Sequence, residues 1–218
     1  MSIIIPALNE AATLASTIAS IGDSGAEIIV VDAGSSDDTV QIARDLGARI
    51  VNSSRRQRGF QLNRGAQEAR AGTLLFLHAD TLLPHDALKN LREALERADV
   101  AGGAFVRRYA SSSKFLRATC FLARCRNRLI GWHLGDQAMF VRRSVFFELG
   151  GFREVDQFED LDFSRRLARR GRAVTLDPGV TTSSRRFSQG ALRRTVRDFG
   201  LTIRYLLRGL PASSDEAG

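Results

Sequence analysis

Along the first hundred residues, short apolar runs alternate with longer segments in which apolar residues recur at helical spacing. Short apolar runs at residues 3–5, 27–31, 49–51 and 73–77 predict four β-strands. Apolar residues at helical spacing follow each run and predict four helices, which carry Leu14, Ile18 and Ile21; Val40, Ala43 and Leu46; Leu62, Ala66 and Ala69; and Leu88, Leu91 and Leu95. This alternation favours parallel strands joined by right-handed crossovers.

Residues typical of helix boundaries stand at the ends of these helices. Asn9 is predicted to cap the first helix, because its short side chain can accept a backbone N–H. Gly22 and Gly47 are predicted to end the first two helices, and Pro84 is predicted to begin the fourth.

The second half of the chain has a less regular pattern. Residues 100–109 predict a strand interrupted by Gly102 and Gly103, and residues 111–130 predict a basic amphipathic helix. The other predicted elements are strands at 137–141 and 173–176, helices at 144–149, 158–170 and 188–208, and a disordered tail after Pro211. Because no repeat or linker divides the chain, residues 1–210 are expected to form one domain, with residues 211–218 as the tail.

Composition narrows the class of protein. The 218 residues are 44% hydrophobic and 26% charged, as in ordinary globular domains, and no run approaches the roughly 18 apolar residues that span a bilayer. No basic segment precedes residues 3–5, so we expect no signal peptide and a cytoplasmic location. Cys120 and Cys125 are expected to be free thiols rather than a disulfide or a metal site.

The charge balance points to an anionic partner. The 32 basic and 24 acidic residues give a net charge of +8, which favours nucleotide phosphates, an anionic membrane or nucleic acid. The basic helices at 111–130 and 188–208 have two interpretations. They could contact the inner face of an anionic membrane, or they could cover the core on one side and stay solvated on the other.

Polar side chains follow three of the predicted strands at the point where each strand ends. These are Asn9 and Glu10, Asp32, and Asp80, which closes the sequence His78-Ala79-Asp80. The carboxyl ends of parallel strands meet at one edge of a sheet, where open α/β sheets bind their ligands. A carboxylate-lined crevice at that edge would suit a divalent metal carrying a nucleotide.

Four segments together resemble the inverting family 2 glycosyltransferases, which have the GT-A fold: residues 3–10 (IIIPALNE), 30–39 (VVDAGSSDDT), 78–80 (HAD) and 158–160 (FED). Three further segments are similar to a subgroup associated with arsenosugar biosynthesis: residues 58–66 (RGFQLNRGA), 76–81 (FLHADT) and 135–140 (GDQAMF). The resemblance runs from residue 1 to about residue 187.

The resemblance implies an α/β protein of the GT-A fold, with a mixed, mostly parallel sheet flanked by helices. It implies a nucleotide-sugar half at about residues 1–100, an acceptor half at 101–187 and a C-terminal basic helix at 188–210. The implied reaction moves a sugar from a nucleotide-diphospho sugar, expected to be a UDP-sugar, to an unknown hydroxyl acceptor with inversion. The implied cofactor is Mg²⁺ or Mn²⁺. A catalytically weak nucleotide-sugar-binding protein is the alternative.

The resemblance also assigns roles to single residues. Asp80 would bind the metal, Asp160 would be the catalytic base and Glu159 would orient it or bind the acceptor. Residues expected to bind the nucleotide sugar are Pro6, Ala7, Asn9, Glu10, Asp32, Arg58, Asn63, His78 and Ala79. Trp132 and Asp136 are expected to contact the acceptor. His78 departs from the family, whose members mostly carry an acid at this position.

Taken one by one, these residues also have structural interpretations. Asp80 could cap a helix, Asp32 could form a turn, and acids such as Asp160 at a helix N-terminus complement its dipole. Arg58 could lie in a solvated basic loop, and Trp132 could cover the core. Nucleic-acid binding is disfavoured, because the basic segments lack the interleaved aromatic residues on which bases stack.

Overall fold

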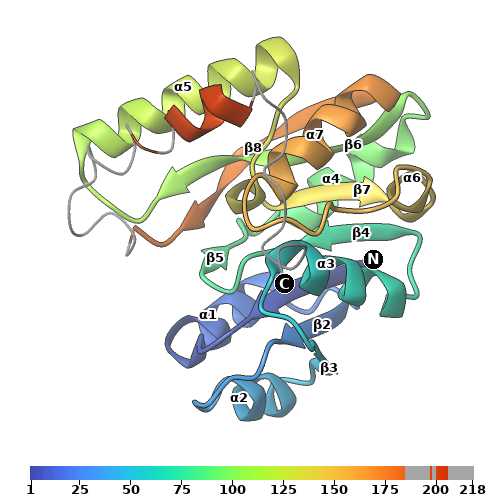
Figure 1. Cartoon of the computed structure of the whole chain (residues 1–218), viewed down its shortest axis with the longest axis vertical. Coiled ribbons are helices and arrows are strands. Elements are labelled where there is room, and N and C mark those ends of the chain that lie inside the picture. The colour runs from blue at the N-terminus through green and yellow to red at the C-terminus, as the bar shows by residue number, and fades with distance from the viewer. Residues whose placement is uncertain (185–196, 198–199, 206–218) are drawn as a thin grey trace.

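The computed structural model describes residues 1–184, 197 and 200–205. One eight-stranded sheet forms its centre, with helices on both faces (Figure 1). In chain order the elements are β1 (Ser2–Ala7), α1 (Ala11–Ile21), β2 (Glu27–Asp32), α2 (Thr39–Asp45), β3 (Arg49–Asn52), α3 (Arg58–Glu68), β4 (Thr73–Phe76), β5 (Thr81–Leu82), α4 (Ala87–Glu96), β6 (Val100–Tyr109), α5 (Lys114–Ile130), the 3₁₀ helix η1 (Gly135–Gln137), β7 (Met139–Arg142), α6 (Arg143–Glu148), α7 (Glu159–Arg170) and β8 (Arg172–Thr182).

The strands lie in the order β3-β2-β1-β4-β7-β6-β8-β5. β1, β2, β3 and β4 pair with one another in parallel, as the sequence predicts. β7 runs antiparallel to both β4 and β6, and β8 then pairs with β6 in parallel. The result is a mixed, mostly parallel sheet, in which the carboxyl ends of β1, β2 and β4 meet at one edge.

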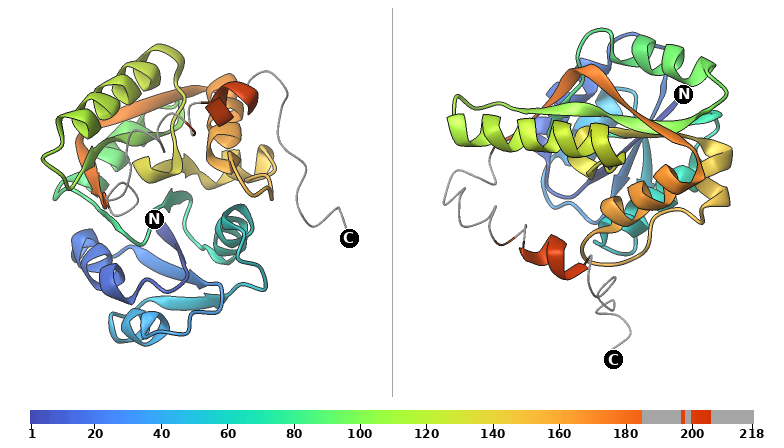
Figure 2. Two further views of the ribbon diagram at one scale, coloured as in Figure 1. Left: turned by 60° about the vertical axis from the view of Figure 1, so that its left-hand side comes forward. Right: turned by 90° about the horizontal axis from the view of Figure 1, so that it is seen from above.

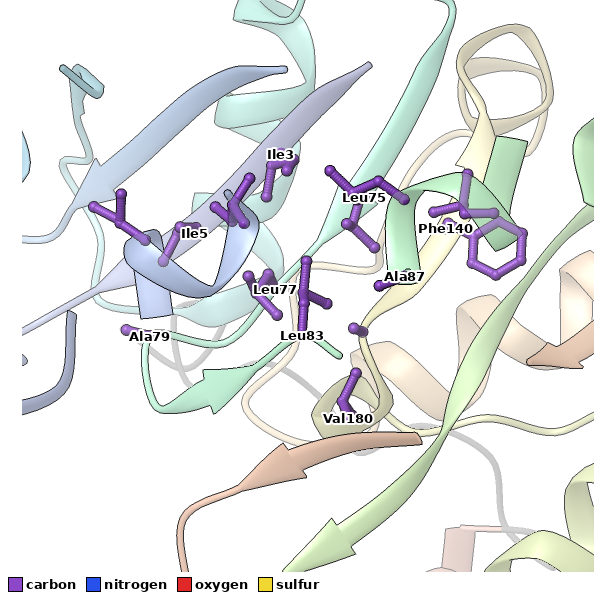
Figure 3. Packing of buried hydrophobic residues seen from close by; sticks show 14 of the residues in the cluster. Ile3, Ile5, Leu75, Leu77, Ala79, Leu83, Ala87, Phe140 and Val180 are labelled. Carbon is purple, nitrogen blue, oxygen red and sulfur yellow. The ribbon is translucent and has the colours of Figure 1, made fainter. Parts of the chain in front are cut away.

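The core has two layers because side chains alternate across a strand. Ile3 and Ile5 of β1 pack against residues of α1 and α4 on one face of the sheet, where Figure 3 shows them near Leu75 and Leu77. Ile4 points to the other face and joins the cluster formed with residues of α3, α6 and α7. The three consecutive isoleucines therefore join the two layers through a single strand.

Two predicted strands of the second half exist but differ in extent from the prediction, and glycine explains one of the differences. Gly102 and Gly103 do not interrupt β6, because both lie inside one continuous strand. A Cβ at either position would collide with a carbonyl oxygen, that of Phe140 or that of Val174, so glycine allows the close approach of β7 and β8. The predicted strand at 173–176 is longer than expected, because β8 follows β6 over most of its length.

Several element boundaries differ from the prediction as well. The fourth helix begins at Ala87 with Asp86 as its N-cap, not at Pro84. The strand predicted at 137–141 begins only at Met139, because Ala138 has a left-handed backbone with φ of 49°. Asn9 does not cap α1. Glu10 holds that position, and Asn9 itself is left-handed with φ of 55°.

The C-terminal predictions fall largely outside the described residues. Residue 197 and residues 200–205 are helical, while the rest of the helix predicted at 188–208 and the tail at 211–218 lie outside. Cys120 and Cys125 are free, as expected. Within the described part of the chain, no helix is both long enough and apolar enough to cross a membrane.

Candidate active site

The loops that follow β1 and β2 are joined by hydrogen bonds. The Ser36 backbone N–H donates to Asn9 Oδ1 over 2.8 Å, and the Asn9 N–H donates to Ser35 Oγ over 2.9 Å. The Glu10 N–H donates to Thr39 Oγ1 over 2.8 Å. We call residues 7–10 and 32–39 the N-terminal cluster. Its polar side chains are engaged largely with backbone N–H groups, which fixes the shape of this edge.

Asp32 is the buried acid of the N-terminal cluster, with 6% of its surface exposed. Its carboxylate accepts the N–H groups of Gly34 over 3.0 Å and Ser35 over 3.1 Å. The structural interpretation as a turn former therefore applies to Asp32. Ala7 lies opposite Asp32 in the β1–β2 pairing, which places the two residues side by side at the strand ends.

Helix α3 links this edge to a second group of charged residues. The buried Gln61 side chain donates to the carbonyl oxygens of Ala7 and Val31, over 3.2 and 2.8 Å. Arg58, one turn earlier on α3, pairs with Glu159 at the start of α7, with 3.5 Å between Nη1 and Oε1. Arg58 is thus not merely part of a solvated loop.

Glu159, which is buried, and Asp160, which is half-buried, form an acidic pair at the start of α7. Burial, reinforced by the neighbouring Asp160 charge, raises the pKa of Glu159 to about 7, although Arg58 opposes the shift. Burial also raises the pKa of Asp160, against the effect of the Gly135 N–H that its Oδ2 accepts over 2.7 Å. Phe158, just before the pair, is left-handed with φ of 71°. Such conformations are found at functional sites more often than elsewhere.

Gly135 brings His78 and Asp160 together from distant parts of the chain. A Cβ on Gly135 would lie 3.0 Å from His78 Nε2 and 3.2 Å from Asp160 Oδ2. Sequence reasoning did not assign Gly135 a role. The sequence offered one indication of such a role, because Gly135 directly precedes Asp136 in the segment 135–140 that carries part of the family resemblance.

Asp136 forms a close ion pair with Arg107 of β6, with 2.6 Å between Oδ2 and Nη1. Burial opposes ionisation of Asp136, but the Arg107 guanidinium outweighs it and holds the pKa of Asp136 below its usual value. Arg107 also lies over the Tyr109 ring, 4.7 Å from its centroid. This partner could not be predicted from the sequence, because Arg107 is 29 residues away from Asp136. We call residues 135–136, 159–160, Arg58 and Arg107 the C-terminal cluster.

Asp80 lies where β4 passes into β5. Its carbonyl oxygen accepts the Ser183 N–H over 3.1 Å, and the preceding Ala79 carbonyl accepts Thr17 Oγ1 over 2.9 Å. These bonds fix the backbone and leave the carboxylate half-buried. The described residues hold no group of three or more metal-ligating side chains. A single carboxylate fits Mg²⁺ or Mn²⁺ when substrate phosphates supply the other ligands.

Two further predicted site residues have structural contacts. The Asn63 amide exchanges hydrogen bonds with the Phe152 backbone, both of 2.9 Å, and so ties α3 to the loop before α7. Trp132 is half-buried, and the Arg165 guanidinium lies 5.1 Å from its ring centroid. An acceptor ring that stacked on this face of Trp132 would have to replace Arg165.

The amino-acid sequence matches that of a known protein family. Residues 2–169 match the family model described as glycosyl transferase family 2. The chain belongs to glycosyltransferase family 2. A PGL/p-HBAD biosynthesis glycosyltransferase of Mycobacterium bovis is 32% identical over 231 residues, which cover 98% of this chain and 84% of that protein.

Solved structures of glycosyltransferases share the fold. A mannosyltransferase of Pyrobaculum calidifontis, solved with GDP-Man and Mn²⁺, has a TM-score of 0.70 and 23% identity over 93% of this chain and 64% of its own. S. aureus TarS in complex with UDP-GlcNAc has a TM-score of 0.68 and 16% identity over 84% of this chain. This chain spans 58% of the TarS chain. The predicted GT-A fold is confirmed.

Proposed function

We propose that this glycosyltransferase moves a sugar from a nucleoside-diphosphate sugar, with UDP as the expected nucleotide, to a hydroxyl group of an acceptor with inversion. The observation that carries the proposal is the Asp160 carboxylate. It is half-buried, its pKa is raised and the Gly135 N–H donates to one of its oxygens. A carboxylate with a raised pKa is suited to take a proton at neutral pH.

In the proposed reaction the acceptor oxygen attacks the anomeric carbon while Asp160 takes the hydroxyl proton. The new carbon–oxygen bond forms on the face opposite the leaving group, and the bond to the nucleoside diphosphate breaks. Arg107 keeps Asp136 ionised beside this position, where Asp136 can accept hydrogen bonds from acceptor hydroxyls. Glu159, paired with Arg58, orients the region next to the base.

The donor would lie along the N-terminal cluster. The neighbouring strand ends of Ala7 and Asp32, fixed by Gln61, would form the base and ribose pocket. His78 and Ala79 would face the diphosphate. A divalent cation, Mg²⁺ or Mn²⁺, held by Asp80 and the donor phosphates, would neutralise charge on the leaving diphosphate. The Mn²⁺ bound with GDP-Man in the Pyrobaculum structure supports this choice of cofactor.

Two finer predictions come from resemblance alone: the arsenosugar-associated subgroup and the hexosyl nature of the sugar. The cytoplasmic location is likewise a prediction. The alternative of a catalytically weak binding protein rests on His78, and metal-dependent hydrolysis of the donor would separate it from a competent enzyme.

A thermal-shift screen of UDP-sugars and GDP-mannose, with and without Mn²⁺ or Mg²⁺, tests the proposal. A donor at a hundred times its Kd should stabilise the protein by about 2.7 kcal/mol, which is a Tm increase of about 5–10 °C. The stabilising donor is then incubated with the protein, and release of nucleoside diphosphate is followed. If no nucleotide sugar raises Tm under any of these conditions, the proposal is wrong.

A further inference from the structure

Helix α5 presents large apolar side chains to solvent. Phe121 and Leu122 are each 66% exposed and Leu129 is 83% exposed, with Phe115 and Ile130 exposed to a smaller degree. Leu122 and Leu129 are seven residues apart and lie on the same side of the helix. Another side of the helix packs on the protein through Leu116, Ala123 and Asn127, which are buried. Phe115, Leu122 and Leu129 therefore form a stripe on a side of α5 that does not pack on the core.

Basic side chains border this surface, and no acid interrupts it. The sequence of α5, KFLRATCFLARCRNRLI, contains five basic residues and no Asp or Glu. Lys114, Arg117 and Arg128 are exposed. Arg124 instead pairs with Asp177 of β8 over 2.9 Å, and Arg126 donates to the Trp132 carbonyl over 3.1 Å. We call the five exposed apolar residues, with Lys114, Arg117 and Arg128, the α5 face.

We propose that the α5 face binds the surface of an anionic lipid bilayer. An apolar stripe bordered by lysine and arginine is the arrangement of helices that lie in the membrane interface. The apolar residues enter the boundary between headgroups and acyl chains, and the cations stay among the anionic headgroups. Asp177, the acid that pairs with Arg124 of α5, also pairs with Arg108, so its charge is balanced by two cations.

Charge argues against two other occupants. A second copy docked through the same face would bring two sets of cations together without an acid on either helix. Residues 185–196 contain four arginines and no acid, so this segment carries charge of the same sign as the α5 face. An anionic bilayer complements both the apolar side chains and the charge of the α5 face.

The α5 face is connected to the candidate site through the chain itself. α5 runs along β6 and β8 at the edge of the molecule (Figure 2), and it ends at Gly131, directly before Trp132 and the segment that carries Gly135 and Asp136. Docking of α5 would hold the C-terminal cluster at the membrane side of the protein. The inference does not depend on the proposed transfer reaction.

Co-sedimentation with vesicles tests the inference. We expect the full-length protein to bind vesicles of phosphatidylglycerol and phosphatidylcholine, to bind pure phosphatidylcholine weakly and to be released by high salt. The variant Phe121→Ser/Leu122→Ser/Leu129→Ser should bind at least about tenfold more weakly. Lys114→Gln/Arg117→Gln/Arg128→Gln should lose about fivefold in affinity for each charge removed. All six side chains are exposed, so folding should be kept.

A matched control carries similar changes elsewhere on the surface. Leu46→Ser/Lys89→Gln removes an exposed apolar residue and an exposed cation far from α5, and it should bind vesicles like the wild type. UDP binding should be unchanged in every variant, which separates this inference from the proposed function. Wild-type protein that ignores anionic vesicles, or apolar and charge variants that bind as well as wild type, would overturn the proposal.

A second readout identifies any competing occupant. Cys120 and Cys125 are changed to Ser, and a polarity-sensitive fluorophore is attached to the new thiol of Leu129→Cys. Its emission should be that of a water-exposed group in the free protein and should shift to the blue when anionic vesicles are added. If the fluorophore is shielded from water in the absence of vesicles, another part of the chain covers the α5 face. A dimer in sedimentation analysis that the triple Ser variant dissociates would assign it to a second copy. Either result contradicts the bilayer proposal.

Discussion

The N-terminal and C-terminal clusters both carry acids at the carboxyl edge of the sheet, but the partners of those acids differ. Asp32 in the N-terminal cluster accepts backbone N–H groups of its own turn, so it is held by neutral partners. In the C-terminal cluster, Asp136 and Glu159 face the guanidinium groups of Arg107 and Arg58.

The acids of the C-terminal cluster differ from one another in protonation. Within the C-terminal cluster the pKa of Asp136 is lowered, while those of Glu159 and Asp160 are raised. Acids whose environments push their pKa values apart are typical of sites that move protons. The comparison suggests that the N-terminal cluster provides a fixed shape for binding and the C-terminal cluster provides the chemistry.

The strongest test of this division is Asp160→Asn. The amide keeps the shape of the side chain but cannot take the acceptor proton, so transfer should fall by about 10²–10⁴-fold while UDP binding stays nearly intact. Steady-state kinetics and calorimetry measure the two effects. Asp86→Asn, at the start of α4, serves as the control. Near-wild-type turnover would move the base elsewhere, with Glu159 the next candidate and Asp136 after it.

A second test concerns the metal. Asp80→Ala should weaken metal-dependent UDP binding by at least about tenfold, because the remaining ligands would come from the diphosphate and water. Calorimetry with UDP and Mn²⁺ measures this, with the metal-free titration as its control. Wild-type binding of UDP that EDTA does not weaken would contradict the assignment of Asp80.

Asp32→Asn tests the N-terminal cluster. The amide keeps one acceptor oxygen for the two N–H groups of the turn but loses the negative charge and the second acceptor oxygen, so UDP affinity should fall by up to about tenfold. The turnover of bound donor should change less than the affinity. A variant that binds UDP like wild type but turns over slowly would reverse the roles assigned to the two clusters.

Glu159→Gln tests the electrostatics of the C-terminal cluster through stability. Because folding raises the pKa of Glu159 from 4.5 to about 7, the folded state favours the protonated form, and stability is lost as pH rises through that range. The variant lacks this loss, so its stability relative to wild type should increase between about pH 4 and pH 8, by roughly 1–3 kcal/mol. Urea denaturation at several pH values measures the difference. If the difference in unfolding free energy between the variant and the wild type does not change with pH, the pKa of Glu159 is not raised.

The smallest expected effect belongs to His78→Asp. The family mostly carries an acid here, so Mn²⁺-dependent UDP binding should be kept or strengthened by a few-fold. Because His78 lies beside Gly135 and Asp160, a new carboxylate should raise the pKa of Asp160 further and move the rise of activity to higher pH. Complete loss of metal-dependent binding would make His78 itself a ligand.

Much of the first half of this fold was determined locally and could be predicted from the sequence. Strands such as β1 and helices such as α1 can be predicted because their apolar residues recur with periods of about two and 3.6 residues. These periods depend only on residues close together in the sequence. The polar strand ends at Asp32 and Asp80 follow from the same pattern, because parallel strands carry their carboxyl ends to one edge.

The partners of the site residues could not be predicted in this way. Arg107 on β6 meets Asp136, and Arg58 on α3 meets Glu159, 29 and 101 residues apart. Such pairs depend on how β7 enters the sheet antiparallel to β4 and brings the second half of the chain back to the edge of the first.

The sequence by itself determined the alternating elements of the first half, the polar strand ends and the resemblance to family 2. Only the tertiary structure decided which acids are buried, which of them face a cation and which accept a backbone N–H group. The physical reason is that a pKa depends on burial and on charges within a few ångströms. Those distances are set by the packing of distant segments, such as Gly135 against His78 and Asp160.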